Sequence, residues 1–179
     1  LSLAARIHAL DSEDMFGHVS RFVDDLEAAL VAVDDRTSPW LAELRTRTWA
    51  GVLCLGMGGS AAGGSFLSSL ADHDGASPVL SHADAALPGW VSAEWLVLAT
   101  SYSGNTAETL SATRTAIERG LTVVVVATGG ELAGLAETHA HVHLVGAPGG
   151  QPPRSAFGHI FGRQVALMRS LGLLPAGQD

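Results

Sequence analysis

The chain has 179 residues, a formal net charge of −8 and 47% apolar residues, a size that suits one domain or at most two small ones. Its single cysteine, Cys54, excludes an internal disulfide and a multi-cysteine zinc site, and a chain of this length needs neither to form a core. All ten basic residues are arginine, which excludes a lysine Schiff-base enzyme and a P-loop, and the acidic balance argues against nucleic acid and anionic membranes as partners.

The N-terminal residues do not look like a targeting segment. The first ten residues contain Arg6 and His8 and are too short and too polar for a secretory signal. No apolar run approaches the roughly 20 residues that a membrane helix needs. We therefore expect a soluble, cytoplasmic protein without a membrane partner.

The first predicted element is an amphipathic helix between residues 15 and 33. Apolar residues recur there at helical spacing, while Asp24, Asp25 and Glu27 lie on the opposite side. Asp11 and Ser12 precede it as possible caps. We expect its apolar side to pack in the core, so that residues 1–50 form a helical segment docked on a domain of residues 51–179.

After residue 50, short apolar runs alternate with helical segments. The pattern predicts buried strands at 52–55, 79–81, 95–99, 122–127 and 142–145, separated by helices at 61–70, 107–119 and 131–138 and followed by one at 155–170. Continuous apolar strands alternating with helices predict a parallel sheet covered on both faces. The predicted fold class is α/β, a three-layer α-β-α sandwich with the flavodoxin-like strand order 2-1-3-4-5.

Ligands of such sheets bind beyond the carboxyl ends of the strands, where the strand order reverses. In the order 2-1-3-4-5, that point lies between the first and third strands, and the loops after these strands are the most unusual in the chain. The first reads GMGGSAAGG from residue 56 and opens a helix, so that its backbone amides can approach a ligand closely. A glycine-rich turn that serves only packing is the alternative.

The loop after the third strand, SYSGNT, brings together Ser101, Ser103 and Thr106 just before a helix. Hydroxyl groups and the free amides of a helix N-terminus can together hold phosphate oxygens without a lysine. A serine or threonine helix cap would explain Thr106 but not the two serines. The sequence therefore predicts an oxyanion site at this loop.

Arg154 follows the fifth strand at the same edge of the sheet, near the start of the last helix. A positive charge there opposes the helix dipole, so that an anion should compensate it. That anion could be a ligand, or it could be a nearby carboxylate of the protein.

The motifs GMGGSAAGG, SYSGNTAETL, ATGGELAGLA and QPPRSAFGHIF resemble the sugar isomerase (SIS) domain, most closely the N-terminal half of the bifunctional phosphoglucose/phosphomannose isomerase family. The resemblance implies that residues 51–179 form an SIS domain that binds a sugar phosphate and forms a homodimer. We expect no metal or cofactor. It implies that Ser101, Ser103 and Thr106 hold the phosphate and that Gly59 and Ser60 contact the sugar. It also implies that Arg154 stabilises the negative charge of an enediolate during aldose–ketose isomerisation.

The chain departs from that family in several respects. The family has two SIS halves in tandem, and its general-base glutamate and ring-opening histidine belong to the second half. The family sequence Gln-Pro-Arg-Ala-Ala reads Pro-Pro-Arg-Ser-Ala here. Three functions therefore stay open: part of an isomerase, a phosphosugar-binding module without catalysis, and a dinucleotide-binding domain. The last rests on the pattern G-x-G-x-x-A at Gly56, Gly58 and Ala61 and on Asp84 as a ribose ligand.

Overall fold

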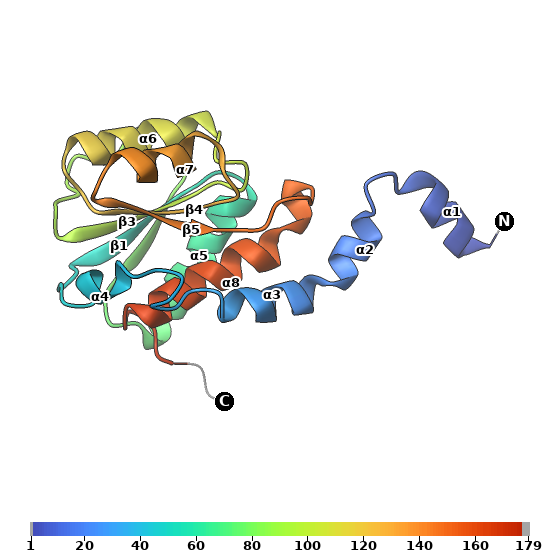
Figure 1. The fold of residues 1–179 in the computed structure, drawn as a ribbon, viewed down its shortest axis with the longest axis horizontal. Helices are drawn as coiled ribbons and strands as arrows, with labels where there is room; N and C mark the ends of the chain where they lie inside the picture. Colours follow the sequence, from blue (N-terminus) through green and yellow to red (C-terminus); the bar gives the residue numbers. More distant parts are fainter. Residues whose placement is uncertain (1, 177–179) are drawn as a thin grey trace.

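The computed structural model describes residues 2–176 and contains one five-stranded parallel sheet with the order β2-β1-β3-β4-β5 (Figure 1). The strands are β1 (Gly51–Leu55), β2 (Val79–His82), β3 (Trp95–Thr100), β4 (Val123–Ala127) and β5 (Val142–Gly146). The described helices are α1 (Leu3–Leu10), α2 (Met15–Ser20), α3 (Phe22–Leu30), α4 (Leu41–Leu44), α5 (Gly59–Asp74), α6 (Ala107–Glu118), α7 (Gly130–Thr138) and α8 (Phe157–Ser170), and a short 3₁₀ turn, η1, spans Pro153–Ser155. The predicted α/β class and strand order are confirmed.

Alternate residues of the strands pack into two separate cores, one on each face of the sheet. One core joins the side of β1 and β3 that carries Val52 and Leu96 to α5 and α8. The other joins the side that carries Leu53 and Val97 to α6 and α7. Figure 1 shows these helix pairs on opposite faces of the sheet. The three-layer sandwich is therefore confirmed, and it arises because strands buried on both faces need helices on both faces.

Cys54 lies in β1 within the core that faces α5 and α8, and its side chain is buried. Burial raises the pKa of its thiol to about 12, because the charged thiolate loses hydration. At neutral pH the group therefore stays a thiol, which makes it a small apolar core residue and a poor nucleophile.

The predicted N-terminal helix is wrong in part. It is interrupted at Arg21, whose φ of −90° and ψ of 4° end α2 before α3 begins. The half before the break, together with α1, projects beyond the sandwich, and only α3 lies along α8 (Figure 1). Phe16 and Val19, on the apolar side expected in the core, are therefore exposed, Phe16 by 67%, and Val23 in α3 is exposed as well.

Asp11 nevertheless caps α2, as its place before the helix predicts. Its carboxylate accepts hydrogen bonds from the backbone N–H groups of Met15 at 2.7 Å and Phe16 at 2.8 Å. These amides have no partner within the helix, so the carboxylate satisfies them and also interacts favourably with the helix dipole.

Two glycines of α8 bring α3 close to the sandwich. A Cβ atom at Gly162 would lie 2.5 Å from Cβ of Ala29 and 2.9 Å from the carbonyl oxygen of Leu26. A Cβ atom at Gly158 would lie 2.9 Å from the carbonyl oxygen of Phe22. Only glycine allows this approach, so the pair of glycines one turn apart determines where α3 docks.

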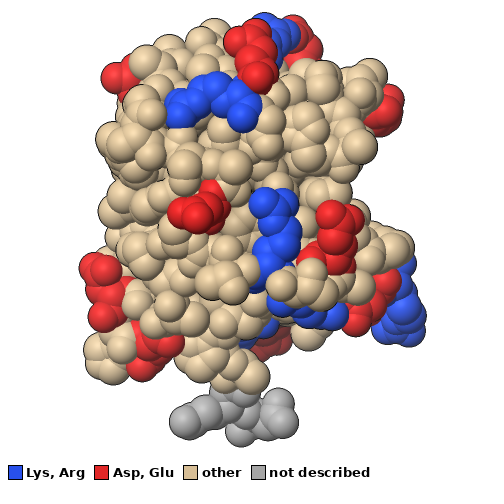
Figure 2. Space-filling model, turned by 90° about the vertical axis from the view of Figure 1, so that its left-hand side faces the viewer, with Lys and Arg blue, Asp and Glu red and all other residues tan. Residues whose placement is uncertain are grey.

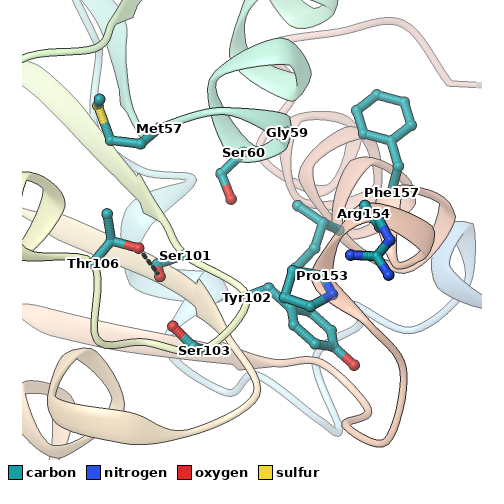
Figure 3. Close-up of a pocket in the computed structure, with 11 residues that line it drawn as sticks. Met57, Gly59, Ser60, Ser101, Tyr102, Ser103, Thr106, Pro153, Arg154 and Phe157 are labelled. Carbon is teal, nitrogen blue, oxygen red and sulfur yellow. Dashed lines mark hydrogen bonds between the residues drawn. The ribbon is translucent and has the colours of Figure 1, made fainter. Parts of the chain in front are cut away.

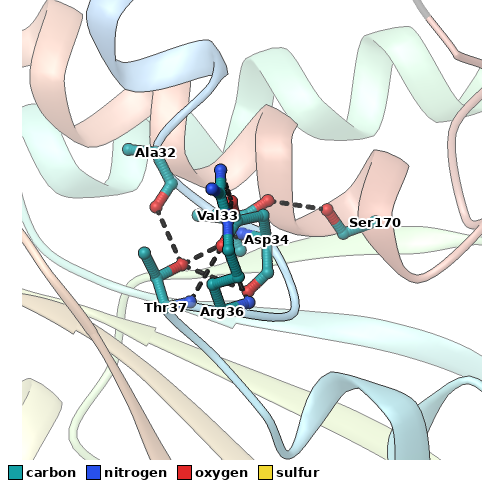
Figure 4. A network of polar contacts seen from close by, with 6 residues as sticks. All are labelled: Ala32, Val33, Asp34, Arg36, Thr37 and Ser170. Carbon is teal, nitrogen blue, oxygen red and sulfur yellow. Dashed lines mark hydrogen bonds and ion pairs between the residues drawn. The ribbon is translucent and has the colours of Figure 1, made fainter.

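A polar network ties the segment after α3 to the end of α8 (Figure 4). The Asp34 carboxylate accepts hydrogen bonds from the backbone N–H groups of Thr37 at 2.8 Å and Arg36 at 3.0 Å, and the Ser170 hydroxyl donates to the carbonyl oxygen of Val33 at 3.0 Å. The bonds from Thr37 and Arg36 lower the pKa of Asp34, the backbone bond from Thr37 most strongly. The network closes the turn that directs the chain from α3 toward α4 and β1.

The alternating histidines His139, His141 and His143, at and just before β5, are half-buried. The ring of His143 stacks on Trp40 with centroids 4.7 Å apart. Burial lowers the pKa of His143. It also lowers the pKa of His159 in α8, where the loss of hydration outweighs the attraction of Asp25.

These two histidines predict that the protein loses stability in mild acid. Their pKa values are lower in the folded chain than the ordinary value of 6.5, so the unfolded chain binds more protons as the pH falls below that value. The two neutral histidines contribute fully to the free energy of unfolding above about pH 7. This contribution is lost as the pH falls through 6.5 toward their pKa values in the folded chain. Urea unfolding at pH 7.5 and 5.5 should show a lower free energy of unfolding at pH 5.5. The double variant His143→Gln, His159→Gln should reduce that difference, and an unchanged difference would contradict the assignment.

Candidate functional site

The two unusual loops meet beside each other at one edge of the sheet. β1 and β3 are adjacent and in register, with Leu55 opposite Ala99, so the loops that follow them leave the sheet at the same level. This is the point at which the strand order reverses, because β2 lies on one side of β1 and β3 on the other. A cavity of about 370 Å³ opens between these loops and the start of α8, within the usual range of small-molecule sites.

All six residues predicted to contact a sugar phosphate line this cavity. They come from three segments of the chain: the start of α5, the loop after β3, and the turn η1 before α8 (Figure 3). The complete set of lining residues is Met57, Gly59, Ser60, Ser101, Tyr102, Ser103, Thr106, Pro153, Arg154, Phe157 and Ile160. The topology thus brings together segments that lie far apart in the sequence.

The hydroxyl groups of the loop after β3 form a cluster on one wall of the cavity (Figure 3). Ser101 is only 2% exposed, and its Oγ lies 2.8 Å from Oγ1 of Thr106. Ser101 Oγ also accepts a hydrogen bond from the backbone N–H of Gly104 at 3.2 Å. Thr106 occupies the N-cap position of α6, yet its side chain makes no capping bond. Its hydroxyl therefore belongs to the cluster, and a helix cap does not account for it.

Two helices begin at the cavity. α5 has 16 residues and starts at Gly59, and α6 has 12 residues and starts directly after Thr106. The first amides of a helix have no partner within it, and the helix dipole gives this end a partial positive charge. Hydroxyl donors and two such ends on the same cavity favour an anionic ligand.

The loop after β3 is fixed by the loop after β4. The carbonyl oxygen of Tyr102 accepts hydrogen bonds from the backbone N–H of Thr128 at 2.9 Å and from its hydroxyl at 2.8 Å, and the N–H of Leu132 donates to the carbonyl oxygen of Gly104 at 3.0 Å. Gly104 has a φ of +71°, and a Cβ atom there would overlap the carbonyl oxygen of Gly129. Glycine is required at this position both by the backbone conformation and by the close approach.

The cavity also has an apolar wall, which the sequence did not predict. Met57, Phe157 and Ile160 contribute to it. The ring of Phe157 is held in a cluster with Phe161, at a centroid distance of 5.3 Å, and Phe66, at 5.8 Å. Met57 could have been predicted to line the cavity, because it lies inside the glycine-rich loop. Phe157 and Ile160 could not, because their spacing is that of any amphipathic helix.

Arg154 lines the cavity and is also paired with a carboxylate. Its Nη2 atom lies 2.6 Å from Oε2 of Glu13, in the segment between α1 and α2, and both side chains are exposed. The two sequence interpretations of Arg154, as a ligand contact and as an arginine with a protein carboxylate nearby, are thus both compatible with its place. Exposed pairs of this kind contribute little to stability, typically up to about 1 kcal/mol, so a bound anion can displace the carboxylate.

The residues proposed for a dinucleotide site are not arranged for that role. Asp84 does not line the cavity, and its carboxylate accepts a hydrogen bond from the backbone N–H of Ala86 at 3.1 Å. Gly56 serves local packing, since a Cβ atom there would lie 3.0 Å from the backbone of Ser60. No observation of this structure favours the dinucleotide hypothesis over an oxyanion site.

Three further observations describe the rest of the molecule. Arginine and acidic side chains are interspersed on the face shown in Figure 2, without a broad basic patch on that face. Within residues 2–176, no helix is both long and apolar enough to cross a bilayer. Among the side chains that the structure describes, no group of three His, Cys, Asp or Glu is placed to hold a metal ion.

The sequence is similar to those of known isomerases. It is 38% identical over 128 residues to the bifunctional phosphoglucose/phosphomannose isomerase of Caldicellulosiruptor bescii, covering 72% of this chain and 38% of that protein. It is also 38% identical over 116 residues to the protein of the same name from Thermoplasma acidophilum, covering 65% and 35%. The match thus covers less than two fifths of the length of either relative.

The fold has counterparts among solved structures, although no protein-family model matches the chain. The tagatose-6-phosphate ketose/aldose isomerase of Escherichia coli superposes with a TM-score of 0.67 at 15% identity, covering 89% of this chain and 48% of that one. At such low identity the superposition establishes the fold alone. The resemblance predicted from the motifs is confirmed: this chain is a relative of the bifunctional phosphoglucose/phosphomannose isomerases and has the sugar isomerase fold.

Proposed function

We propose that this chain is the phosphosugar-binding SIS domain of an aldose–ketose isomerase that interconverts glucose 6-phosphate or mannose 6-phosphate with fructose 6-phosphate. The observation that carries the proposal is the cavity at the reversal point of the sheet, which Ser101, Ser103, Thr106 and Arg154 line together. The names of the sequence relatives support the choice of substrate. On this proposal, residues 51–179 form the SIS domain, the N-terminal segment of residues 1–50 packs on it through α3 and the residues that follow, and the protein is a cytoplasmic homodimer.

On this proposal, the phosphate and the sugar of the ligand contact different sides of the cavity. The hydroxyl groups of Ser101, Ser103 and Thr106 donate to the phosphate, next to the start of α6. Gly59 and Ser60, at the start of α5, contact the sugar. Arg154 faces the reacting carbons, where its guanidinium stabilises the enediolate that forms while a proton moves between C1 and C2. The general base and the ring-opening group come from the second half of the isomerase.

A second function, phosphosugar binding without catalysis, is favoured by one observation. Among the described residues that line the cavity, none is a histidine, aspartate or glutamate, the side chains that most often move protons in such reactions. This chain alone would then bind the sugar phosphate and not isomerise it. The two functions share the binding site and differ in whether a partner supplies the acid–base groups.

Titration calorimetry with the purified chain tests the proposal. Fructose 6-phosphate should bind, whereas fructose, which lacks the phosphate, should show no measurable heat at the same concentrations. NADH fluorescence should not change on mixing. Failure of the folded chain to bind fructose 6-phosphate would refute the proposal. An isomerase assay of this chain and of a longer natural version then separates the two functions, because only a catalytic protein is active in its long form.

A further inference from the structure

The turn that carries Arg154 is anchored by side chains outside the cavity, with Gln151 at the centre. The Gln151 side-chain amide donates a hydrogen bond to Oδ2 of Asp25 at 3.0 Å, across 126 residues of sequence. Its backbone N–H donates to the hydroxyl oxygen of Tyr102 at 3.2 Å. Gln151 thus links α3, the phosphate-binding loop after β3, and the start of η1.

The backbone between Gln151 and Arg154 has little conformational freedom, so that holding Gln151 in place also restricts Arg154. Pro152 and Pro153 each have a restricted φ angle. Ser155, which is buried, donates hydrogen bonds to the carbonyl oxygen of Pro152 from its N–H and its hydroxyl, both at 2.9 Å. The Ser155 hydroxyl also lies 3.4 Å from Oε1 of Gln151. Fixing Gln151 therefore fixes the backbone position of Arg154.

Asp25 is itself held firmly. Its side chain is 15% exposed, and its Oδ1 lies 3.4 Å from Nε2 of His159, which is 12% exposed. Gly158 allows α3 to approach α8 so closely that a Cβ atom there would lie 3.3 Å from Cβ of Asp25. Hydrogen bonds to a carboxylate are about twice as strong as those between neutral groups, so Asp25 is a strong anchor for the Gln151 amide.

We propose that Asp25 and Gln151 are positioning residues that set the distance between the Arg154 guanidinium and the hydroxyl cluster of Ser101, Ser103 and Thr106. The exposed Glu13, the side chain seen paired with Arg154, is too weak a contact to do this. The consequence for ligand binding rests on the proposed function. If Asp25 positions Arg154 in this way, α3 helps to hold the site in place, although α3 does not line the cavity.

An exchange of the two side-chain groups tests the proposal. Gln151→Glu alone places two carboxylates against each other without a donor, so the anchor is lost. Adding Asp25→Asn restores one hydrogen bond with donor and acceptor reversed, while the amide oxygen introduced by this second substitution can face His159 as Oδ1 of Asp25 does. Asp24→Asn, a change of the neighbouring exposed carboxylate, is the matched control.

Two measurements follow the position of Arg154 in these variants. The first is the ¹H–¹⁵N signal of the Arg154 Nε–H group, identified by its loss in Arg154→Gln. The signal should shift in Gln151→Glu and return in the double variant. The second is binding: the dissociation constant for fructose 6-phosphate should rise about tenfold in Gln151→Glu and recover in the double variant, while that for inorganic phosphate, held by the hydroxyl cluster, should stay unchanged.

The outcomes separate this inference from the proposed function. An unshifted Arg154 signal in Gln151→Glu, or no recovery of the signal in the double variant, overturns the positioning role. Equal weakening of fructose 6-phosphate and inorganic phosphate also overturns it, since that would reveal general damage to the fold. If the wild-type chain binds neither ligand, the proposed function fails, and the Arg154 signal still decides the positioning role.

Discussion

Replacing Ser101 and Ser103 together by alanine is expected to weaken the binding of fructose 6-phosphate at least about 100-fold, because each hydroxyl that donates to a charged phosphate contributes about 1.5–3 kcal/mol. Both side chains line the cavity, and Ser101 is buried within it. The loop should keep its shape, since the Gly104 N–H donates to the Ser101 carbonyl oxygen at 3.1 Å as well as to the lost hydroxyl. Titration calorimetry measures the affinity directly.

Ser111→Ala is the matched control for this double variant. Ser111 lies on the exposed side of α6, in the same helix that begins at the cavity, and it does not line the cavity. Its removal should leave the affinity unchanged and should not lower the urea midpoint, since alanine is favoured over serine inside a helix. An unaltered affinity in the Ser101→Ala, Ser103→Ala variant would show that the phosphate binds elsewhere.

Gly104→Ala is expected to destabilise the fold by at least about 2 kcal/mol, since a left-handed backbone conformation already costs an L-residue about 1–2 kcal/mol. The added Cβ atom would also overlap the carbonyl oxygen of Gly129. That oxygen cannot withdraw easily, because hydrogen bonds from Thr128 and Leu132 tie the two loops together. Urea unfolding should show the loss of stability, and fructose 6-phosphate should bind more weakly because the hydroxyl cluster moves with the loop.

Gly134→Ala provides the comparison for this variant. Gly134 lies in α7, and a Cβ atom there would meet nothing within 4 Å. Alanine is favoured over glycine inside a helix by up to about 1 kcal/mol, so this variant should be as stable as the wild type or more so. If Gly104→Ala proved as stable as Gly134→Ala, the tight contact between the two loops would be refuted.

The sequence by itself determined the sheet and the location of the cavity. The run TVVVVA and the other short apolar segments predict strands buried on both faces, and the predicted strand order places GMGGS and SYSGNT side by side. Both predictions succeed because they depend on local patterns and on a topology with few alternatives. For the same reason, the spacing of Ser101, Ser103 and Thr106 could predict that they lie together, and all three line one cavity.

The tertiary structure decided which groups surround those residues. The break at Arg21 and the exposure of Phe16 do not follow from helical periodicity, which indicates an apolar side of a helix but not whether another element covers it. The pairs Arg154–Glu13 and Gln151–Asp25 join residues 141 and 126 positions apart. Such contacts depend on how closely α3 packs on α8, and therefore on the absence of a side chain at Gly158 and Gly162, a detail of packing that residue patterns along the chain do not encode.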